Sequence, residues 1–415
     1  MSSTTTVGRR IPGNARDGEG TQMTKRTVED LDVAGRRVLV RVDFNAPMKD
    51  GVITDDSKIR AALPTLRYLI EHGAKVIVAS HLGRPKGEVV ESLRTGPVAE
   101  RLSVLLDRPV AALRDCIGPE VEAAIARMHD GDVAMLENLR FYPGEEKNDP
   151  AFAEALAALA DLYVNDAFGS SHRAHASIVG VPRLLPAAAG RLMERELRML
   201  GGLLEHPERP FAAVIGGAKL SSKLGVLKNI VPLVDVLLIG GGMVATAYSS
   251  RGYGVGASRV EEGLLDYVRE LTEQAASRGV RLLLPMDVVV AESLEGQGAV
   301  RTVPADAIPD GWVIVDIGPE TIAEYSRVLG SCRTVVWSGP MGVFETPAFA
   351  RGTQAIATAL AGLDAVTVVG GGSTVEAVTK MGVADRMSHV STGGGATLEF
   401  LSGEALPGVA ALPDR

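Results

Sequence analysis

The sequence contains little cysteine and no long apolar run, and each absence excludes a class of protein. Only two cysteines occur in 415 residues, Cys116 and Cys332, with no second Cys or His at metal-ligand spacing. We therefore expect a reducing, cytoplasmic location and no zinc site. No apolar run reaches the roughly 18–20 residues of a membrane helix, so no membrane contact is predicted. A net charge of −8 argues against a broad nucleic-acid surface.

The length and composition indicate two globular domains. A chain of 415 residues is too long for one compact domain, and 46% hydrophobic residues can fill two cores. The first 22 residues differ from the rest, because they are polar and lack apolar patterning. They carry no secretory signal, and we expect a disordered tail over 1–22, with the ordered chain starting near Met23.

Short β-branched runs alternate with helical patterns along the chain. The predicted strands cover 37–44, 75–80, 132–137, 161–166, 211–217, 234–241, 280–290, 311–318, 334–339 and 365–371. Runs that are apolar on both faces and separated by helices predict parallel strands in an α/β fold. A charged amphipathic helix that ends in His-Pro and Arg-Pro, near 185–210, predicts a connector between two α/β units.

Glycine clusters follow several predicted strands in the second half. They are GGAK at 216–219, GGGM at 240–243, GGGST at 370–374 and STGGGAT at 391–397. Glycine lets the backbone approach a ligand closely, and the following helix N-terminus offers N–H donors. A tight packing turn explains any single cluster equally well, but several together favour a nucleotide cleft. A Walker P-loop is absent, and no dinucleotide fingerprint follows a strand.

Basic residues gather at the predicted strand ends of the first half. They are His81, Arg84, Arg140, His172 and Arg173. Any one of these is as readily a surface residue paired with a carboxylate, but together they predict an anion site, because guanidinium groups match carboxylate and phosphate. The pair His172/His175 lacks a third ligand, so we predict no metal there. A basic pocket facing a nucleotide cleft indicates a phosphoryl-transfer enzyme that closes by hinge motion.

Eight segments, in chain order, resemble phosphoglycerate kinases, and the match covers nearly all of residues 25–405. They are VRVDFNAP, SHLGRPKG, LENLRF, NDAFGSSHRAHAS, GGAK, IGGGM, GPMGVFE and STGGGATLEFL. The resemblance implies two Rossmann-like three-layer domains with parallel sheets joined by a hinge helix. The expected bounds are 23–190 for a phosphoglycerate-binding domain, 191–208 for the hinge helix, 209–397 for a nucleotide-binding domain and 398–415 for a C-terminal segment that returns to the first domain.

The resemblance also implies the reaction and the residues that carry it. The reaction is reversible phosphoryl transfer between 1,3-bisphosphoglycerate and ADP, giving 3-phosphoglycerate and ATP. Separately from the resemblance, we expect a monomer, because nothing in the sequence demands a larger assembly. The substrate would contact Asp43, Asn45, Lys58, His81, Arg84, Arg140 and Arg173. Catalysis would involve Lys219, Lys58, Gly371 and Gly395. The nucleotide would contact Gly217, Lys219, Lys223, Gly241, Gly311, Pro340, Glu345, Gly371, Gly372, Ser373 and Thr374. Mg²⁺ would come with the nucleotide, with Ser373 as a weak ligand.

Three positions depart from the family pattern. Lys58 stands where the family reads arginine, and lysine lacks the planar fork and its second donor. If one charge-assisted hydrogen bond is lost, the cost is about 1.5–3 kcal/mol. Arg60 would not replace it, because two residues along a helix it points about 200° away. Ser338 replaces the usual asparagine, and Ser373 replaces an aspartate that helps to hold magnesium.

These departures leave alternatives open. They are either tolerated variations of an active kinase or signs of a weakened paralogue that binds phosphoglycerate and nucleotide as a sensor. A third hypothesis is a partner-binding protein that docks through residues 1–22. A dehydrogenase is disfavoured by the missing dinucleotide fingerprint.

Overall fold

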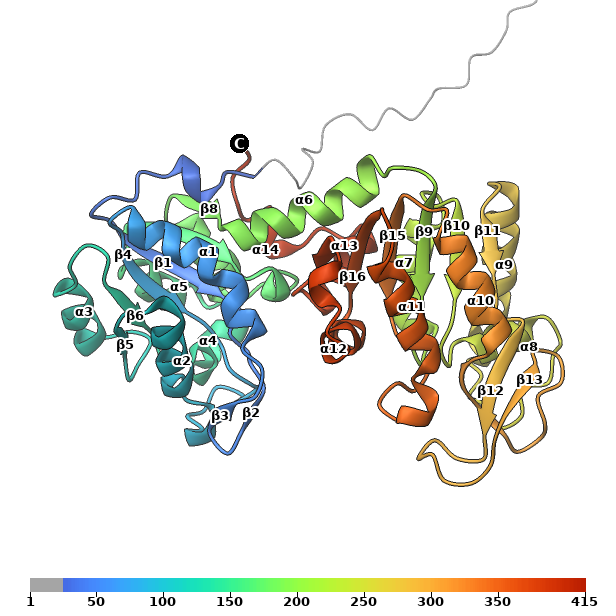
Figure 1. Ribbon diagram of the computed structural model, residues 1–415. Coiled ribbons are helices and arrows are strands. Elements are labelled where there is room, and N and C mark those ends of the chain that lie inside the picture. The colour runs from blue at the N-terminus through green and yellow to red at the C-terminus, as the bar shows by residue number, and fades with distance from the viewer. Residues whose placement is uncertain (1–24) are drawn as a thin grey trace, which may run out of the picture.

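Two α/β lobes lie side by side in the computed structural model, which describes residues 25–415 (Figure 1). Each lobe contains a six-stranded sheet whose neighbouring strands are all parallel. The spatial orders are β5-β6-β4-β1-β7-β8 and β11-β10-β9-β15-β16-β17. The predicted fold class, two domains with parallel sheets, is confirmed. The tail predicted over 1–22 lies outside the described residues.

The first lobe holds the sheet that begins with β1. Its strands are β1 (Arg37–Val42), β4 (Lys75–Ala79), β5 (Val110–Ala112), β6 (Val133–Met135), β7 (Leu162–Asp166) and β8 (Ala187–Ala189), with a small hairpin of β2 (Met48–Lys49) and β3 (Val52–Ile53). Its helices are α1 (Ser57–Glu71), α2 (Gly96–Leu106), α3 (Pro119–Ala126), α4 (Pro143–Glu146) and α5 (Pro150–Ala157). Helix α5 has Asp149 as its N-cap, whose side chain accepts hydrogen bonds from the amides of Ala151 and Phe152.

Both faces of this sheet are buried, as the apolar runs predict. Leu39 packs into one core cluster, whereas its neighbours Val38 and Val40 pack into another on the opposite face. Arg41 is the exception in β1, because it is charged and fully buried. A charge in that position requires partners from other elements.

The second lobe holds the other parallel sheet and a smaller antiparallel one. The parallel strands are β9 (Phe211–Ile215), β10 (Val236–Ile239), β11 (Arg281–Leu283), β15 (Thr334–Ser338), β16 (Val366–Gly370) and β17 (His389–Val390). The antiparallel strands are β12 (Asp287–Ala291), β13 (Val300–Pro304) and β14 (Val313–Ile317). The helices are α7 (Leu224–Ile230), α8 (Val244–Ser250), α9 (Leu265–Ser277), α10 (Pro319–Leu329), α11 (Arg351–Ala361), α12 (Gly372–Lys380) and α13 (Gly395–Leu401).

The single strand predicted over 280–290 is wrong, because the run divides between the two sheets. Pro285 lies between β11 and β12, and proline has no N–H to donate within a sheet. The strand predicted over 311–318 forms, as β14, but it pairs antiparallel with β12. The apolar runs therefore predicted that strands form here, but not which of the two sheets each strand joins.

Helix α6 (Arg191–Glu205) runs between the lobes, and the chain end returns to the first lobe (Figure 1). Glu196 of α6 is fully buried and accepts hydrogen bonds from the amide (2.7 Å) and hydroxyl (2.9 Å) of Thr392. Past α14 (Pro407–Ala410), Asp414 forms an ion pair with Lys25 (2.7 Å). The boundary predicted between 397 and 398 falls inside α13.

Candidate active site

A cleft of about 1770 Å³ separates the carboxyl ends of the two parallel sheets. All seven side chains predicted to bind the substrate line it: Asp43, Asn45, Lys58, His81, Arg84, Arg140 and Arg173. The second lobe contributes Gly372 and Gly395 to the same lining. Because these residues follow β1, β4, β6, β7 and β16 or lie on α1 and α13, the parallel topology brings them together.

Asp43 lies at the centre of the first-lobe wall. Its Oδ2 is 3.2 Å from Lys58 Nζ, and its Oδ1 accepts a hydrogen bond from the Asn45 amide. Burial alone would raise the pKa of Asp43, but the surrounding basic groups, with Lys58 and Arg41 among them, lower it to about 2. Asp43 is therefore an ionised carboxylate at neutral pH, and Lys58 is its partner.

The position of Arg60 bears on the departure at Lys58. Arg60 Nε is 2.8 Å from Asp56 Oδ1, and Arg101 binds the other oxygen of the same carboxylate at 2.6 Å. Arg60 lines the outer part of the cleft but is held by this pair. Because Asp56 holds its guanidinium, Arg60 is not free to take the place of an arginine at position 58.

The remaining basic residues differ in how firmly they are held. Arg140 is buried and donates to the Gly83 carbonyl (2.8 Å), with Glu146 Oε1 3.3 Å from its Nε. Arg173 Nε donates to His172 Nε2 (3.1 Å), which steadies its guanidinium at the cleft. Arg84 is exposed at the rim. Two guanidinium groups are thus fixed before any ligand binds.

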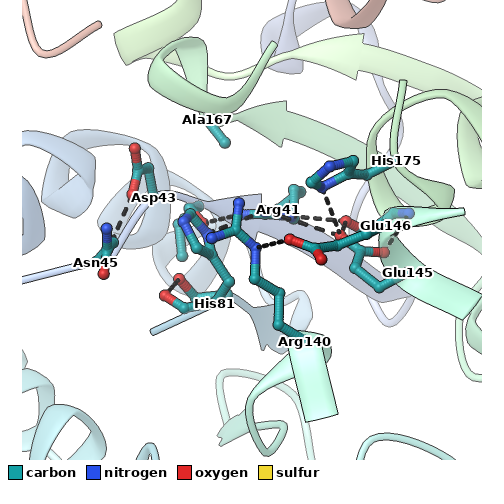
Figure 2. A network of polar contacts seen from close by, with 12 residues as sticks. Arg41, Asp43, Asn45, His81, Arg140, Glu145, Glu146, Ala167 and His175 are labelled. Atoms are coloured by element: carbon teal, nitrogen blue, oxygen red, sulfur yellow. Dashed lines mark hydrogen bonds and ion pairs between the residues drawn. The ribbon is translucent and has the colours of Figure 1, made fainter. Parts of the chain in front are cut away.

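Sequence reasoning missed a buried network behind this wall, which Figure 2 shows. Arg41 of β1 lies between His81 and Glu145, with its NH2 3.3 Å from His81 Nδ1 and 4.0 Å from Glu145 Oε1. Both charged side chains are completely buried. The available signal was one arginine inside the apolar run RVLVRV, because a buried strand rarely holds an unpaired charge.

The glycine loops of the second lobe pack tightly against one another. The Gly217 amide donates to the Pro340 carbonyl (3.0 Å), and the Gly241 amide donates to the Met341 carbonyl (2.9 Å). A Cβ on Gly241 would lie 2.5 Å from the Gly217 nitrogen, and its φ of +70° also favours glycine. Three strand ends, those of β9, β10 and β15, therefore form one continuous backbone surface.

Lys223 lies beneath this surface without a carboxylate partner among its described contacts. Its Nζ donates to Ser338 Oγ (2.9 Å), and burial lowers its pKa to about 8. A Cβ on Gly371 would lie 3.3 Å from the same hydroxyl. Ser338, which replaces the family's asparagine, thus links Lys223 to the start of α12. Lys219 is exposed in the loop after β9.

Ser373, Glu345 and Gly311, which are also predicted to contact the nucleotide, are not part of this packed backbone surface. Ser373 is exposed in the first turn of α12, whereas Thr374 is buried and its hydroxyl accepts from the Gly339 amide (2.7 Å). Glu345 is exposed in the loop after β15. Gly311 lies just before the amino end of β14. The strand contacts the loop after β15 nearer its other end, where the Val343 amide donates to the Val315 carbonyl (2.8 Å). The role of Gly311 stays a prediction.

The residues around the start of α12 do not fit a magnesium ion held by the protein. Within residues 25–415 no three His, Cys, Asp or Glu side chains are grouped to hold a metal. The nearby donors are the hydroxyls of Ser338, Ser373 and Thr374, whereas Mg²⁺ prefers carboxylate and phosphate oxygens. Nucleotide phosphates and water would have to supply most of its ligands.

Comparisons with known proteins give one consistent result. The profile of the family described as phosphoglycerate kinase matches residues 28–404. The chain is 56% identical to a phosphoglycerate kinase of Moorella thermoacetica over 393 residues, covering 95% of this chain and 100% of that protein. It is likewise 56% identical to one of Synechococcus elongatus over 400 residues, covering 94% and 100%.

Solved structures agree with the sequence relatives. The phosphoglycerate kinase of Coxiella burnetii superposes with a TM-score of 0.84 at 39% identity, covering 93% of this chain and 98% of that one. The enzyme of Pyrococcus horikoshii gives a TM-score of 0.82 at 36% identity, with the same coverage of both chains. The similarity therefore extends over both lobes.

Proposed function

The chain belongs to the phosphoglycerate kinase family, and we propose that the cleft between its lobes performs the family's reaction with the residues identified above. The enzyme is a phosphotransferase with a carboxyl group as acceptor. It moves the acyl phosphate of 1,3-bisphosphoglycerate to ADP, and in reverse it phosphorylates 3-phosphoglycerate with ATP. The observation that carries the proposed site is the cleft itself, which collects seven predicted substrate residues from separate strand ends.

The first-lobe wall is proposed to bind the phosphoglycerate. Arg140 and Arg173, already held by Gly83 and His172, match its carboxylate and phosphate, with Arg84 at the rim. Asp43 and Asn45 are proposed to take its hydroxyl group, because they offer acceptor oxygens at the floor of the cleft. His81 completes the set as a hydrogen-bond donor.

The second lobe is proposed to bind ADP or ATP. Gly217, Gly241 and Pro340 form the backbone surface for the nucleotide, Glu345 takes the ribose hydroxyls, and Gly311 adds a further contact. The start of α12, with Gly371, Gly372, Ser373 and Thr374, offers N–H donors to the phosphates. Lys223 adds a buried positive charge there.

The transfer step requires alignment and charge stabilisation rather than a general base. The attacking oxygen is ionised at neutral pH in either direction, so no proton must be removed. Lys219, Lys58 and the Gly371 and Gly395 amides are proposed to surround the transferred phosphoryl group once the lobes close. Such closure would bring Lys58 away from Asp43 and towards the nucleotide.

Several finer points complete the proposal. Mg²⁺ enters with the nucleotide, and the divisions at 23–190, 191–208, 209–397 and 398–415 describe substrate domain, hinge helix, nucleotide domain and returning segment. The enzyme is proposed to act as a monomer in the cytoplasm. No helix in residues 25–415 is long and apolar enough to cross a membrane.

Steady-state turnover of the purified chain with 3-phosphoglycerate and Mg–ATP tests the proposal. We expect rapid turnover, a Lys219→Met variant with a lower kcat but an unchanged KM for phosphoglycerate, and an Arg173→Met variant with a raised KM. Tight binding of both ligands with turnover near background would instead support the weakened paralogue, which the relatives do not favour.

A further inference from the structure

The buried pair of Arg41 and Glu145 is costly, and packing alone does not account for it. Both side chains are completely buried, and their nearest charged atoms are 4.0 Å apart. Desolvating two charges often costs more than their attraction returns, so a buried ion pair is weak support for a purely stabilising role. Its position, directly behind the substrate wall, suggests another role (Figure 2).

Ser177 joins the two charges and orients both. The Ser177 amide donates to Glu145 Oε2 (2.9 Å), and its hydroxyl donates to Oε1 (2.6 Å). The same hydroxyl accepts from Arg41 Nε (2.8 Å), so it donates to one member of the pair and accepts from the other. Tyr163 fixes the Ser177 backbone, because its hydroxyl donates to the Ser177 carbonyl (2.7 Å).

The far end of Arg41 then determines the state of His81. Arg41 NH2 lies 3.3 Å from His81 Nδ1. A guanidinium remains protonated and has no acceptor atom, so Nδ1 must be the acceptor in this contact. The single proton of a neutral imidazole must then be on Nε2, and no hydrogen bond within residues 25–415 engages that nitrogen. His81 lines the substrate cleft.

The charges around His81 favour the same neutral state. Burial lowers the pKa of His81 well below its usual value, and Arg41, Arg140 and Lys58 lower it further, against the opposing carboxylate of Asp43. These groups come from β1 and the segment after it, from α1 and from the turn after β6. His81 thus offers an N–H donor to an anionic ligand without titrating near neutral pH.

We propose that Glu145 is a positioning residue for the phosphoglycerate site: through Ser177 and Arg41 it fixes His81 as the neutral tautomer with its proton on Nε2. This role rests on the proposed binding of phosphoglycerate in the cleft. A fixed donor needs no reorganisation when the ligand arrives. His175 Nδ1 lies 3.8 Å from Glu145 Oε1, but burial and then Arg140 and Arg41 lower the pKa of His175 to about 3, so His175 adds no positive charge beside Glu145 at neutral pH.

Nitrogen-15 NMR of the imidazole rings tests the proposal on the wild-type protein without ligand. We expect His81 to show the Nε2–H tautomer from pH 5.5 to 8, with no titration. An Nδ1–H tautomer, or a titration near the ordinary histidine pKa, would overturn the proposal. This readout does not depend on turnover, so failure of the proposed function would appear separately, as absent phosphoglycerate activity.

The variant Glu145→Gln keeps the shape of the side chain and removes its charge. We expect a mixture of His81 tautomers and a KM for phosphoglycerate about tenfold higher, as for the loss of one well-placed hydrogen bond, with the KM for Mg–ATP unchanged. Ser177→Ala is a milder change that breaks the same link and keeps the Glu145 charge.

The matched control is Glu146→Gln, which neutralises the next carboxylate of α4. Glu146 faces Arg140 rather than Arg41, so the His81 tautomer should stay fixed. Wild-type NMR signals of His72 and His129, which lie in the same lobe, confirm that a variant is folded there. If folded Glu145→Gln and Ser177→Ala both keep the wild-type His81 spectrum and phosphoglycerate KM, Glu145 has only a structural role and the proposal fails.

Discussion

Lys223 is expected to weaken the fold while serving nucleotide binding, and its replacement by methionine should separate the two effects. The lysine is 6% exposed, and within residues 25–415 its ammonium has only the Ser338 hydroxyl as a partner. Burial lowers its pKa from 10.5 to about 8. The folded protein therefore holds this proton less tightly than the unfolded chain does, which destabilises the fold below pH 8.

The size of this destabilisation follows from the difference between the pKa of Lys223 in the folded protein and in the unfolded chain. A shift of this size corresponds to about 3 kcal/mol of unfavourable free energy at pH 7. Lys223→Met removes this penalty and loses one hydrogen bond to Ser338, worth about 1 kcal/mol. At pH 7 we therefore expect the free energy of unfolding of the variant to be about 2 kcal/mol higher than that of the wild type.

Urea unfolding from pH 7 to 10.5 provides the assay, and calorimetric titration with ADP provides the second readout. The advantage of Lys223→Met should shrink as pH rises from 8 to 10.5, because the wild-type lysine then becomes neutral in both states. ADP should bind the variant more weakly. The control is Lys228→Met on the exposed side of α7, which should change neither property. A variant less stable than wild type at pH 7 would refute the reasoning.

Three further outcomes are expected. Lys58→Met should lower kcat by about ten- to a hundredfold by removing one charge-assisted contact, whereas Lys58→Arg keeps the charge and stays near wild type; equal losses in both would contradict this. Ser373→Asp should lower the Mg²⁺ concentration that gives half-maximal turnover, because a carboxylate suits Mg²⁺ better than a hydroxyl, and Ser373→Asn should not. Burial raises the pKa of Asp166 to about 7, so the folded state keeps a proton that the unfolded chain loses above pH 4. The unfolding free energy of wild type should therefore fall relative to Asp166→Asn by up to about 4 kcal/mol between pH 4 and 7, and parallel pH profiles in denaturant titrations would refute it.

The sequence predicted most of the substrate wall, because its residues stand in short continuous motifs at the ends of strands. Asp43 and Asn45 follow β1, and His81 follows β4, so recognising the strands placed the side chains at one edge of the sheet. The resemblance to a family then assigned a role to each. The assignments to the nucleotide depend on the same resemblance.

The sequence was less informative where partners are distant along the chain. In the apolar run 280–290, Pro285 was a sign of a break, but nothing in the run showed that its two halves join different sheets. Arg41 looked like an ordinary strand residue, since its partners Ser177 and Glu145 come from later turns and helices. Periodicity describes one segment at a time, whereas such contacts depend on how the segments pack.

The sequence by itself thus determined the two parallel α/β lobes, the family and the residues at the strand ends, because local patterning and short motifs encode them. Only the tertiary structure decided the state of the charges. Lys58 is paired with Asp43, Lys223 is buried with no carboxylate partner in the described part of the chain, and His81 accepts from Arg41. Burial and neighbouring charges set these states, and both depend on packing between elements that the chain brings together only when it folds.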